Sequence, residues 1–154
     1  MRVKSIIISF FFLAVLAFCG FQTNAIKQKK DVKQFQDKGI GPVKALKLGP
    51  INQKLADKGS DLFDAKCSLC HDIDDVNLAP ALRGITKVLS PEFIMNYLMN
   101  TAEMQKKDPY LQKLIQDWKR VPIMKDQKLK EKDARAILEY LRTVENSDWF
   151  NKVF

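Results

Sequence analysis

Apolar residues after position 50 recur at the spacing of an α-helix face. Leu55, Gly59, Leu62 and Phe63 fall on one such face just before residue 67. A second stripe, over about residues 131–144, consists of Ala134, Ile137, Leu138, Leu141 and Val144. Both stripes predict amphipathic helices that bury one side.

Two more helices are indicated by the residues at which they begin. Ser90-Pro91-Glu92 and Asp108-Pro109 each place a capping side chain before a proline at the first helical position. No segment alternates apolar and polar residues with the two-residue period of a strand. We therefore predict an all-α domain of four or five short helices over residues 51–146, followed by a C-terminal tail, 147–154.

The first residues have a different pattern. Arg2 and Lys4 precede an apolar run that ends at Phe21, which is the layout of a secretory signal. The run is shorter than the roughly 20 residues that a membrane span needs. Thr23-Asn24-Ala25 offers small side chains for cleavage, so residues 1–25 are predicted to be a signal peptide. The alternatives are a lipoprotein signal ending before Cys19, which would attach a lipid to that cysteine, and an uncleaved anchor helix.

Residues 26–50 are predicted to form a basic tether followed by an extended arm. Lysine and glutamine dominate up to Lys38, and glycines and prolines punctuate the rest. The whole chain has 26 basic and 18 acidic side chains, a net charge of +8. We expect a protein partner with an acidic docking surface, and no nucleic acid.

One motif has clear chemistry, Cys67-Ser68-Leu69-Cys70-His71. Two thiols at C-x-x-C spacing can add to the two vinyl groups of one haem, and the next histidine can bind its iron. His71 is the only histidine, so a structural zinc site lacks ligands. A thioredoxin-like pair would need strands, and a plain disulfide would leave the histidine unexplained.

The sixth iron ligand cannot be a second histidine, which leaves methionine. Met95 and Met99 lie one turn apart within a predicted helix and are expected in the core. Met104 falls in a stretch without helical pattern and is a weak rival. Met124 follows Val-Pro-Ile in a loop, and is the preferred ligand. An open or exchangeable sixth site is the remaining alternative.

From Ala56 to Val144 the sequence resembles the single-haem class I bacterial cytochromes c. The resemblance implies the cytochrome c fold around one covalent haem c. It implies that Gly59 lets the first and last helices touch, near Phe63 and Tyr140. The Met124 loop matches the axial-methionine loop of the family, although Lys130 replaces the usual Ser or Thr cap of the last helix.

The stretch from Leu78 to Gly84 is similar to the G-P-x-L-x-G stretch of the same family, with Ala79 in place of glycine. The resemblance implies that the Pro80 carbonyl accepts a hydrogen bond from the ring of His71. It also implies that Arg83 pairs with a haem propionate.

A narrower resemblance concerns the partner. Gly39 to Lys44, Ile94 to Asn96 and Ala134 to Tyr140 resemble small cytochromes found beside nitrous-oxide reductases in Bacteroidota. This implies a copper enzyme as the electron acceptor.

The function implied is a periplasmic shuttle of single electrons to a terminal reductase or oxidase, with Lys66 and Lys125 steering the partner. The alternative is a haem protein that binds or senses a ligand at an exchangeable sixth site. We expect no enzymatic activity, because the di-haem peroxidases need a second C-x-x-C-H.

Overall fold

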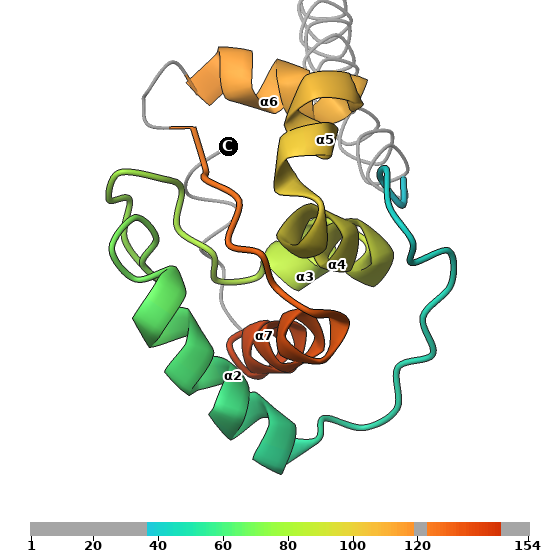
Figure 1. Ribbon diagram of the computed structural model, residues 1–154. Coiled ribbons are helices and arrows are strands. Elements are labelled where there is room, and N and C mark those ends of the chain that lie inside the picture. Colours follow the sequence, from blue (N-terminus) through green and yellow to red (C-terminus); the bar gives the residue numbers. More distant parts are fainter. Residues whose placement is uncertain (1–36, 119–122, 146–154) are drawn as a thin grey trace, which may run out of the picture. The chain divides into compact units, whose positions relative to one another are not determined.

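The computed structural model describes residues 37–118 and 123–145, and within them every regular element is a helix (Figure 1). The helices are α2 (Gln53–Lys66), α3 (Ile85–Val88), α4 (Pro91–Met99), α5 (Thr101–Lys107), α6 (Pro109–Trp118) and α7 (Glu131–Thr143). The all-α prediction is confirmed. The predictions for residues 1–25 with Cys19, for the tether up to residue 36, for residues 121–122 and for the tail 147–154 lie outside the described residues.

The predicted helix starts are confirmed by their caps. The Ser90 hydroxyl accepts a hydrogen bond from the Phe93 N–H at 3.1 Å, and Asp108 accepts one from the Leu111 N–H at 2.9 Å. The side chain of Lys130 makes no capping hydrogen bond at the start of α7. This agrees with the expectation that a lysine, standing where the family usually has Ser or Thr, caps the helix poorly.

Two short helices were not predicted. α3 has four residues and α5 has seven, too few for an apolar stripe to show in the sequence. The prediction that Met104 lies in an irregular stretch is wrong, because it is part of α5. Its side chain is fully buried and packs with Phe93 and Leu111 in a small second core cluster.

α2 and α7 pack against each other more extensively than any other pair of described helices. At Gly59 a Cβ atom would lie 2.0 Å from the carbonyl oxygen of Ala136, so only glycine permits this approach. The rings of Phe63 and Tyr140 lie beside it with centroids 5.3 Å apart. The close contact implied by the family resemblance is confirmed.

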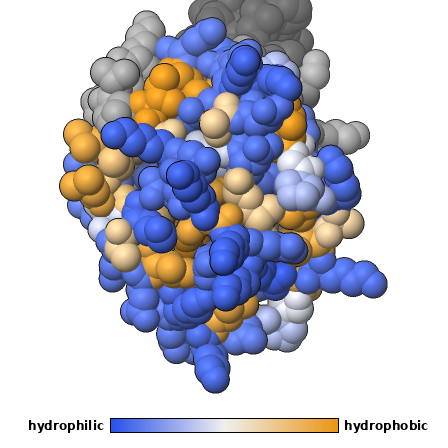
Figure 2. Space-filling model, viewed as in Figure 1, coloured by the Kyte–Doolittle hydropathy of each residue, from blue (hydrophilic) through white to orange (hydrophobic). Residues whose placement is uncertain are grey.

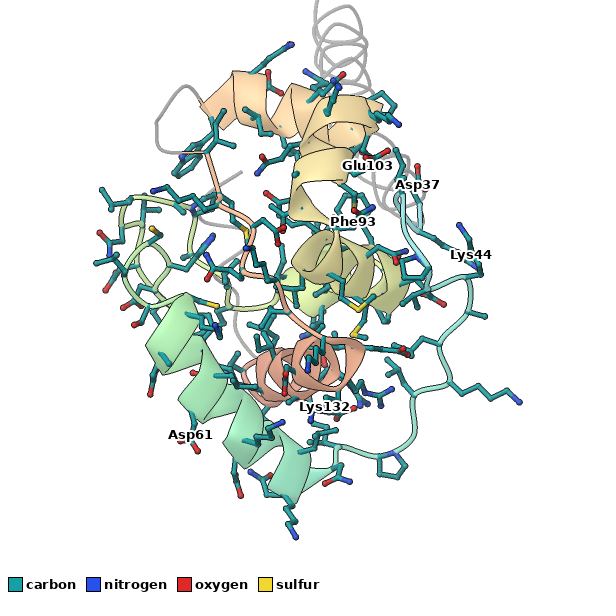
Figure 3. All side chains as sticks on the ribbon, viewed as in Figure 1. Asp37, Lys44, Asp61, Phe93, Glu103 and Lys132 are labelled. Carbon is teal, nitrogen blue, oxygen red and sulfur yellow. The ribbon has the colours of Figure 1, made fainter. Side chains whose placement is uncertain are left out.

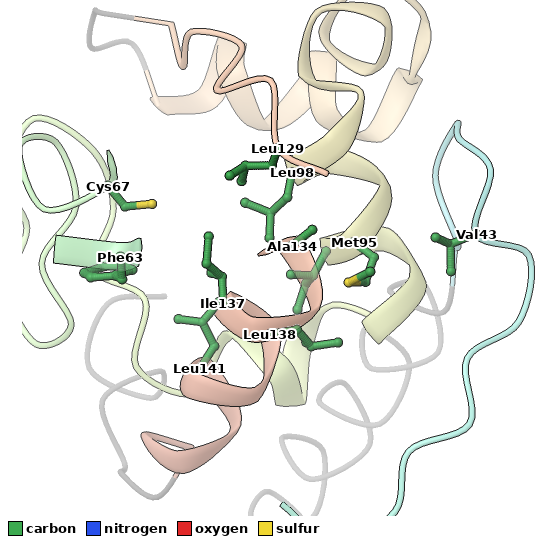
Figure 4. Packing of buried hydrophobic residues seen from close by; sticks show 11 residues of the cluster. Val43, Phe63, Cys67, Met95, Leu98, Leu129, Ala134, Ile137, Leu138 and Leu141 are labelled. Atoms are coloured by element: carbon green, nitrogen blue, oxygen red, sulfur yellow. The ribbon is translucent and has the colours of Figure 1, made fainter. Parts of the chain in front are cut away.

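The main core is built around α7 (Figure 4). Phe63 and Cys67 approach it from one side, and Met95 and Val43 lie on the other side. The sulfur of Cys67 points toward the region of Leu98, Leu129 and Ile137. The end of α2 therefore directs its cysteine into an apolar environment.

The arm before α2 is extended but firmly attached to α4. The fully buried Asn96 side chain accepts from the Val43 N–H at 2.9 Å and donates to the carbonyls of Val43 and Lys38 at 2.9 and 2.8 Å. Gly41 is needed here, since a Cβ would lie 2.3 Å from the Asn96 amide oxygen. Val43 itself joins the main core, so residues 37–50 belong to the packed structure.

A buried carboxylate attaches the end of the arm to α7. Glu139 has no exposed surface, and its oxygens accept from Arg135 at 2.6 Å and from Arg142 at 2.8 Å. The Asn52 N–H donates to it at 3.3 Å, and Arg142 also donates to the Gly49 carbonyl at 2.8 Å. Burial alone would raise the pKa of Glu139, but these donors together lower it.

Candidate functional site

The C-x-x-C-H motif begins where α2 ends. Cys67 caps the helix, and its N–H donates to the Phe63 carbonyl at 2.8 Å. The N–H groups of Cys70 and His71 both donate to the Cys67 carbonyl, at 3.0 and 2.8 Å. These bonds fold the motif into one tight turn, which fixes the backbone of both cysteines and the histidine together.

The two cysteines of the motif lie in the structure as free thiols. Cys67 is buried and Cys70 is half-buried. Burial raises the pKa of the Cys67 thiol to about 11, although Lys66 opposes the rise. Thioether formation would remove this ionisation and leave an apolar sulfur in an apolar environment, so the site suits a covalently attached ring.

The imidazole of His71 is oriented by a single backbone acceptor. Its Nδ1 lies 2.8 Å from the Pro80 carbonyl oxygen, so Nδ1–H is the donor and Nε2 keeps a lone pair for a metal. Burial lowers the pKa of His71, with the Pro80 bond opposing the shift, which favours the neutral ring. The bond that the resemblance implied is present.

Alanine at position 79 does not prevent this geometry. The Ala79 N–H donates to the Cys70 carbonyl at 2.9 Å, and the Leu82 N–H donates to the Asp72 carbonyl at 3.1 Å. These two bonds fold the segment 72–82 back onto the motif. Pro80 is thereby held against His71 without the glycine that is usual in the family.

Arg83, which was expected to pair with a haem propionate, pairs with a carboxylate of the chain in the structure. Its guanidinium pairs with the Asp74 carboxylate through two nitrogens, one of them at 2.8 Å, and reaches the Val144 carbonyl at 3.4 Å. Asp74 also raises the pKa of Arg83. In the structure Arg83 ties the loop after His71 to the end of α7, and its contact with a propionate stays a prediction.

The candidate methionines lie in three different places. Met95 and Met99 belong to the main core, and Met104 belongs to the second cluster. Met124 is half-buried and packs against the main cluster, which also contains Cys67. Of the candidate ligands, Met124 therefore combines an irregular backbone with a position at the same core as the cysteine.

Sequence reasoning missed Gln105, which contacts the Met124 loop. Its amide nitrogen donates to the Met124 carbonyl at 2.8 Å and to the Tyr97 hydroxyl at 3.2 Å. It also missed Asn96 and Glu139, although each is a polar residue within an apolar stretch of a predicted helix. A polar residue in such a stretch indicates a buried polar contact, so the sequence held a signal for these two residues. The sequence around Gln105 held no such signal.

The surface near the motif is mixed in character. Leu69, between the cysteines, is 81% exposed, and Lys66 is exposed beside Cys67. Asp61 points outward from α2 (Figure 3), and Asp64 and Asp72 are also exposed nearby. On the face seen in Figure 2, apolar side chains are interspersed among hydrophilic ones. The charge around the motif is thus not purely basic.

No helix within residues 37–118 and 123–145 has both the length and the apolar character needed to cross a membrane. No group of three or more His, Cys, Asp or Glu side chains is placed there to hold a metal ion.

Comparison with known proteins agrees with the geometry. The family model for cytochrome c matches residues 56–145. The chain is similar to the solved cytochrome c from Rhodothermus marinus, with 42% identity and a TM-score of 0.64, over 68% of this chain and 90% of that one.

Two structures of an engineered cytochrome c from Rhodothermus marinus, Rma TDE, also match with the same coverage. One has 42% identity and a TM-score of 0.62, and the other, which is bound to a carbene intermediate, has 40% identity and a TM-score of 0.61. No curated protein sequence matches the chain.

Proposed function

Because this chain belongs to the cytochrome c family, we propose that it shuttles single electrons in the periplasm through a haem iron bound by His71 and Met124. Family membership makes it a haem-based electron-transfer protein of class I with one covalently bound haem c. The proposal adds the ligand pair, the compartment and the absence of enzymatic turnover. The observation that carries it is the 2.8 Å bond from His71 Nδ1 to the Pro80 carbonyl.

That bond matters because electron transfer needs ligands that stay in place. Bound haem supplies the one-electron change between ferric and ferrous iron. The Pro80 carbonyl fixes the ring of His71 and increases the basicity of its free nitrogen. The main core cluster, which includes Phe63 and Leu138, excludes water from the site. A methionine thioether raises the reduction potential of the iron relative to a second nitrogen ligand.

The compartment and partner are supported by the sequence. The export signal predicted at residues 1–25 supports the periplasm, with attachment to a membrane if Cys19 is acylated. A nitrous-oxide reductase or terminal oxidase is the proposed acceptor. Lys66 and Lys125 support steering of an acidic partner, but the carboxylates of Asp64 and Asp72 oppose it locally, so we expect the transfer rate to fall only modestly with added salt.

Carbon monoxide tests the proposal against the ligand-sensing alternative. Reduced native protein at neutral pH should bind carbon monoxide slowly or not at all, because a fixed thioether blocks the sixth site. The Met124→Ala variant is the positive control and should bind it rapidly. Rapid binding by the native protein would overturn the electron-carrier proposal in favour of an exchangeable site.

A further inference from the structure

Residue Met124 lies in an irregular segment with few attachments to the helices. Within residues 123–130, the Lys128 N–H donates to Asp126 and the Gln127 side chain donates to the Lys125 carbonyl. These bonds are local and do not connect the segment to the rest of the fold. The preceding Ile123 is 52% exposed, and the next buried side chain of the segment is Leu129, which is 8% exposed.

One hydrogen bond attaches Met124 itself to a helix. The Gln105 amide nitrogen on α5 donates to the Met124 carbonyl at 2.8 Å. The same nitrogen donates to the Tyr97 hydroxyl on α4 at 3.2 Å. An amide NH₂ group has two hydrogens, so both are used, one on each partner.

The Tyr97 contact fixes the direction of the Gln105 side chain. Tyr97 is half-buried, and burial raises the pKa of its hydroxyl, which keeps that group neutral and able to accept the bond. A glutamine bonded to both the Tyr97 hydroxyl and the Met124 carbonyl has few alternative rotamers that satisfy both groups. The amide is therefore pre-oriented toward the Met124 carbonyl by a helix that does not carry the loop.

We propose that Gln105 is a positioning residue for the axial thioether, an inference that rests on Met124 being the sixth ligand. By holding the backbone of Met124 against α5, it limits the excursions that take the sulfur away from the iron. A neutral hydrogen bond of ordinary strength corresponds to about a fivefold change in such an equilibrium. Loss of the bond should therefore raise the population with the methionine detached by about that factor.

The test uses holoprotein of the full chain with Gln105→Leu, which removes the donor at similar size. The matched control is Gln112→Leu, because Gln112 also donates from its amide to a backbone carbonyl, that of Lys106 at 2.7 Å. Imidazole is titrated into the oxidised proteins while the weak sulfur-to-iron charge-transfer band is followed. The apparent affinity for imidazole should rise about fivefold in Gln105→Leu and stay unchanged in Gln112→Leu.

Two further measurements keep the result interpretable. If circular dichroism shows that Gln105→Leu does not fold, Gln105→Glu replaces it. The carboxylate keeps the shape of the side chain but cannot donate a hydrogen bond. A merely structural role would lower the melting temperature without changing imidazole affinity, and that outcome overturns the inference. If the wild-type protein lacks the charge-transfer band, the His/Met proposal fails, and the inference falls with it.

Discussion

The two sides of the proposed haem site are held in different ways. On the His71 side, the cysteines and the histidine share one hydrogen-bonded turn at the end of a 14-residue helix. On the Met124 side, an irregular segment is attached through the side chain of Gln105. The first arrangement is local in sequence and would gain covalent links through its two cysteines, so it should be permanent. The second depends on a distant side chain, so it is where ligand exchange should begin.

The largest expected effect comes from removing the covalent links on the His71 side. A protein with both Cys67→Ala and Cys70→Ala should retain no covalent haem, because His71 alone gives a single coordinate bond. The pyridine haemochrome spectrum should lose the signature of thioether-linked haem. Ser68→Ala, between the two cysteines, should keep it. An unchanged spectrum in the double variant would contradict the assignment.

A large effect is also expected where α2 meets α7. Gly59→Ala places a methyl group within 2.0 Å of a backbone oxygen, so the helices must separate. We expect a loss of about 3 kcal/mol in the free energy of unfolding, measured by urea denaturation. Gly49→Ala is the matched control, since a Cβ there meets nothing within 4 Å. Equal stability of the two variants would show that the close approach is not required.

A smaller, pH-dependent effect is expected at Glu139. Replacement by Gln leaves Arg135 and Arg142 without their buried anion. Because both arginines are partly exposed, the loss in the free energy of unfolding should be about 2 kcal/mol at neutral pH. The pKa of Glu139 is lowered in the fold, so its contribution is present above the unfolded value of about 4.3 and is lost as the pH falls through the folded value.

Urea denaturation at pH 7 and pH 3 measures this difference. The gap between wild type and Glu139→Gln should narrow at pH 3. Glu103→Gln, in an exposed pair with Lys107, is the control and should change stability only marginally. A gap that stays constant with pH would mean that the carboxylate does not stabilise the fold as an anion.

The sequence predicted those parts of the fold that depend on local signals. The starts of α4 and α6 were readable because a capping side chain and a proline act within a few residues. The C-x-x-C-H motif was readable for the same reason. The contact of Pro80 with His71 was reached only through a resemblance, since its two residues are nine positions apart.

Features that depend on tertiary contacts were not predictable. α3 and α5 are too short to show a period, and Asn96 becomes a buried anchor only once the arm folds over it. Gln105 bonds to residues 8 and 19 positions away, and nothing in its own neighbourhood in the sequence indicates either partner. The Met124 side of the site depends on these distant contacts, and it is therefore also the side that the sequence predicts least well.

The most direct test of the His71/Met124 pair is the sulfur-to-iron charge-transfer band of the oxidised protein. We predict that the band is present in the wild type and absent in Met124→Ala, with a lower reduction potential in the variant. Met99→Ala, which alters a core methionine, should keep the band. If the band persists in Met124→Ala, Met124 is not the ligand and the account of this side of the molecule is wrong.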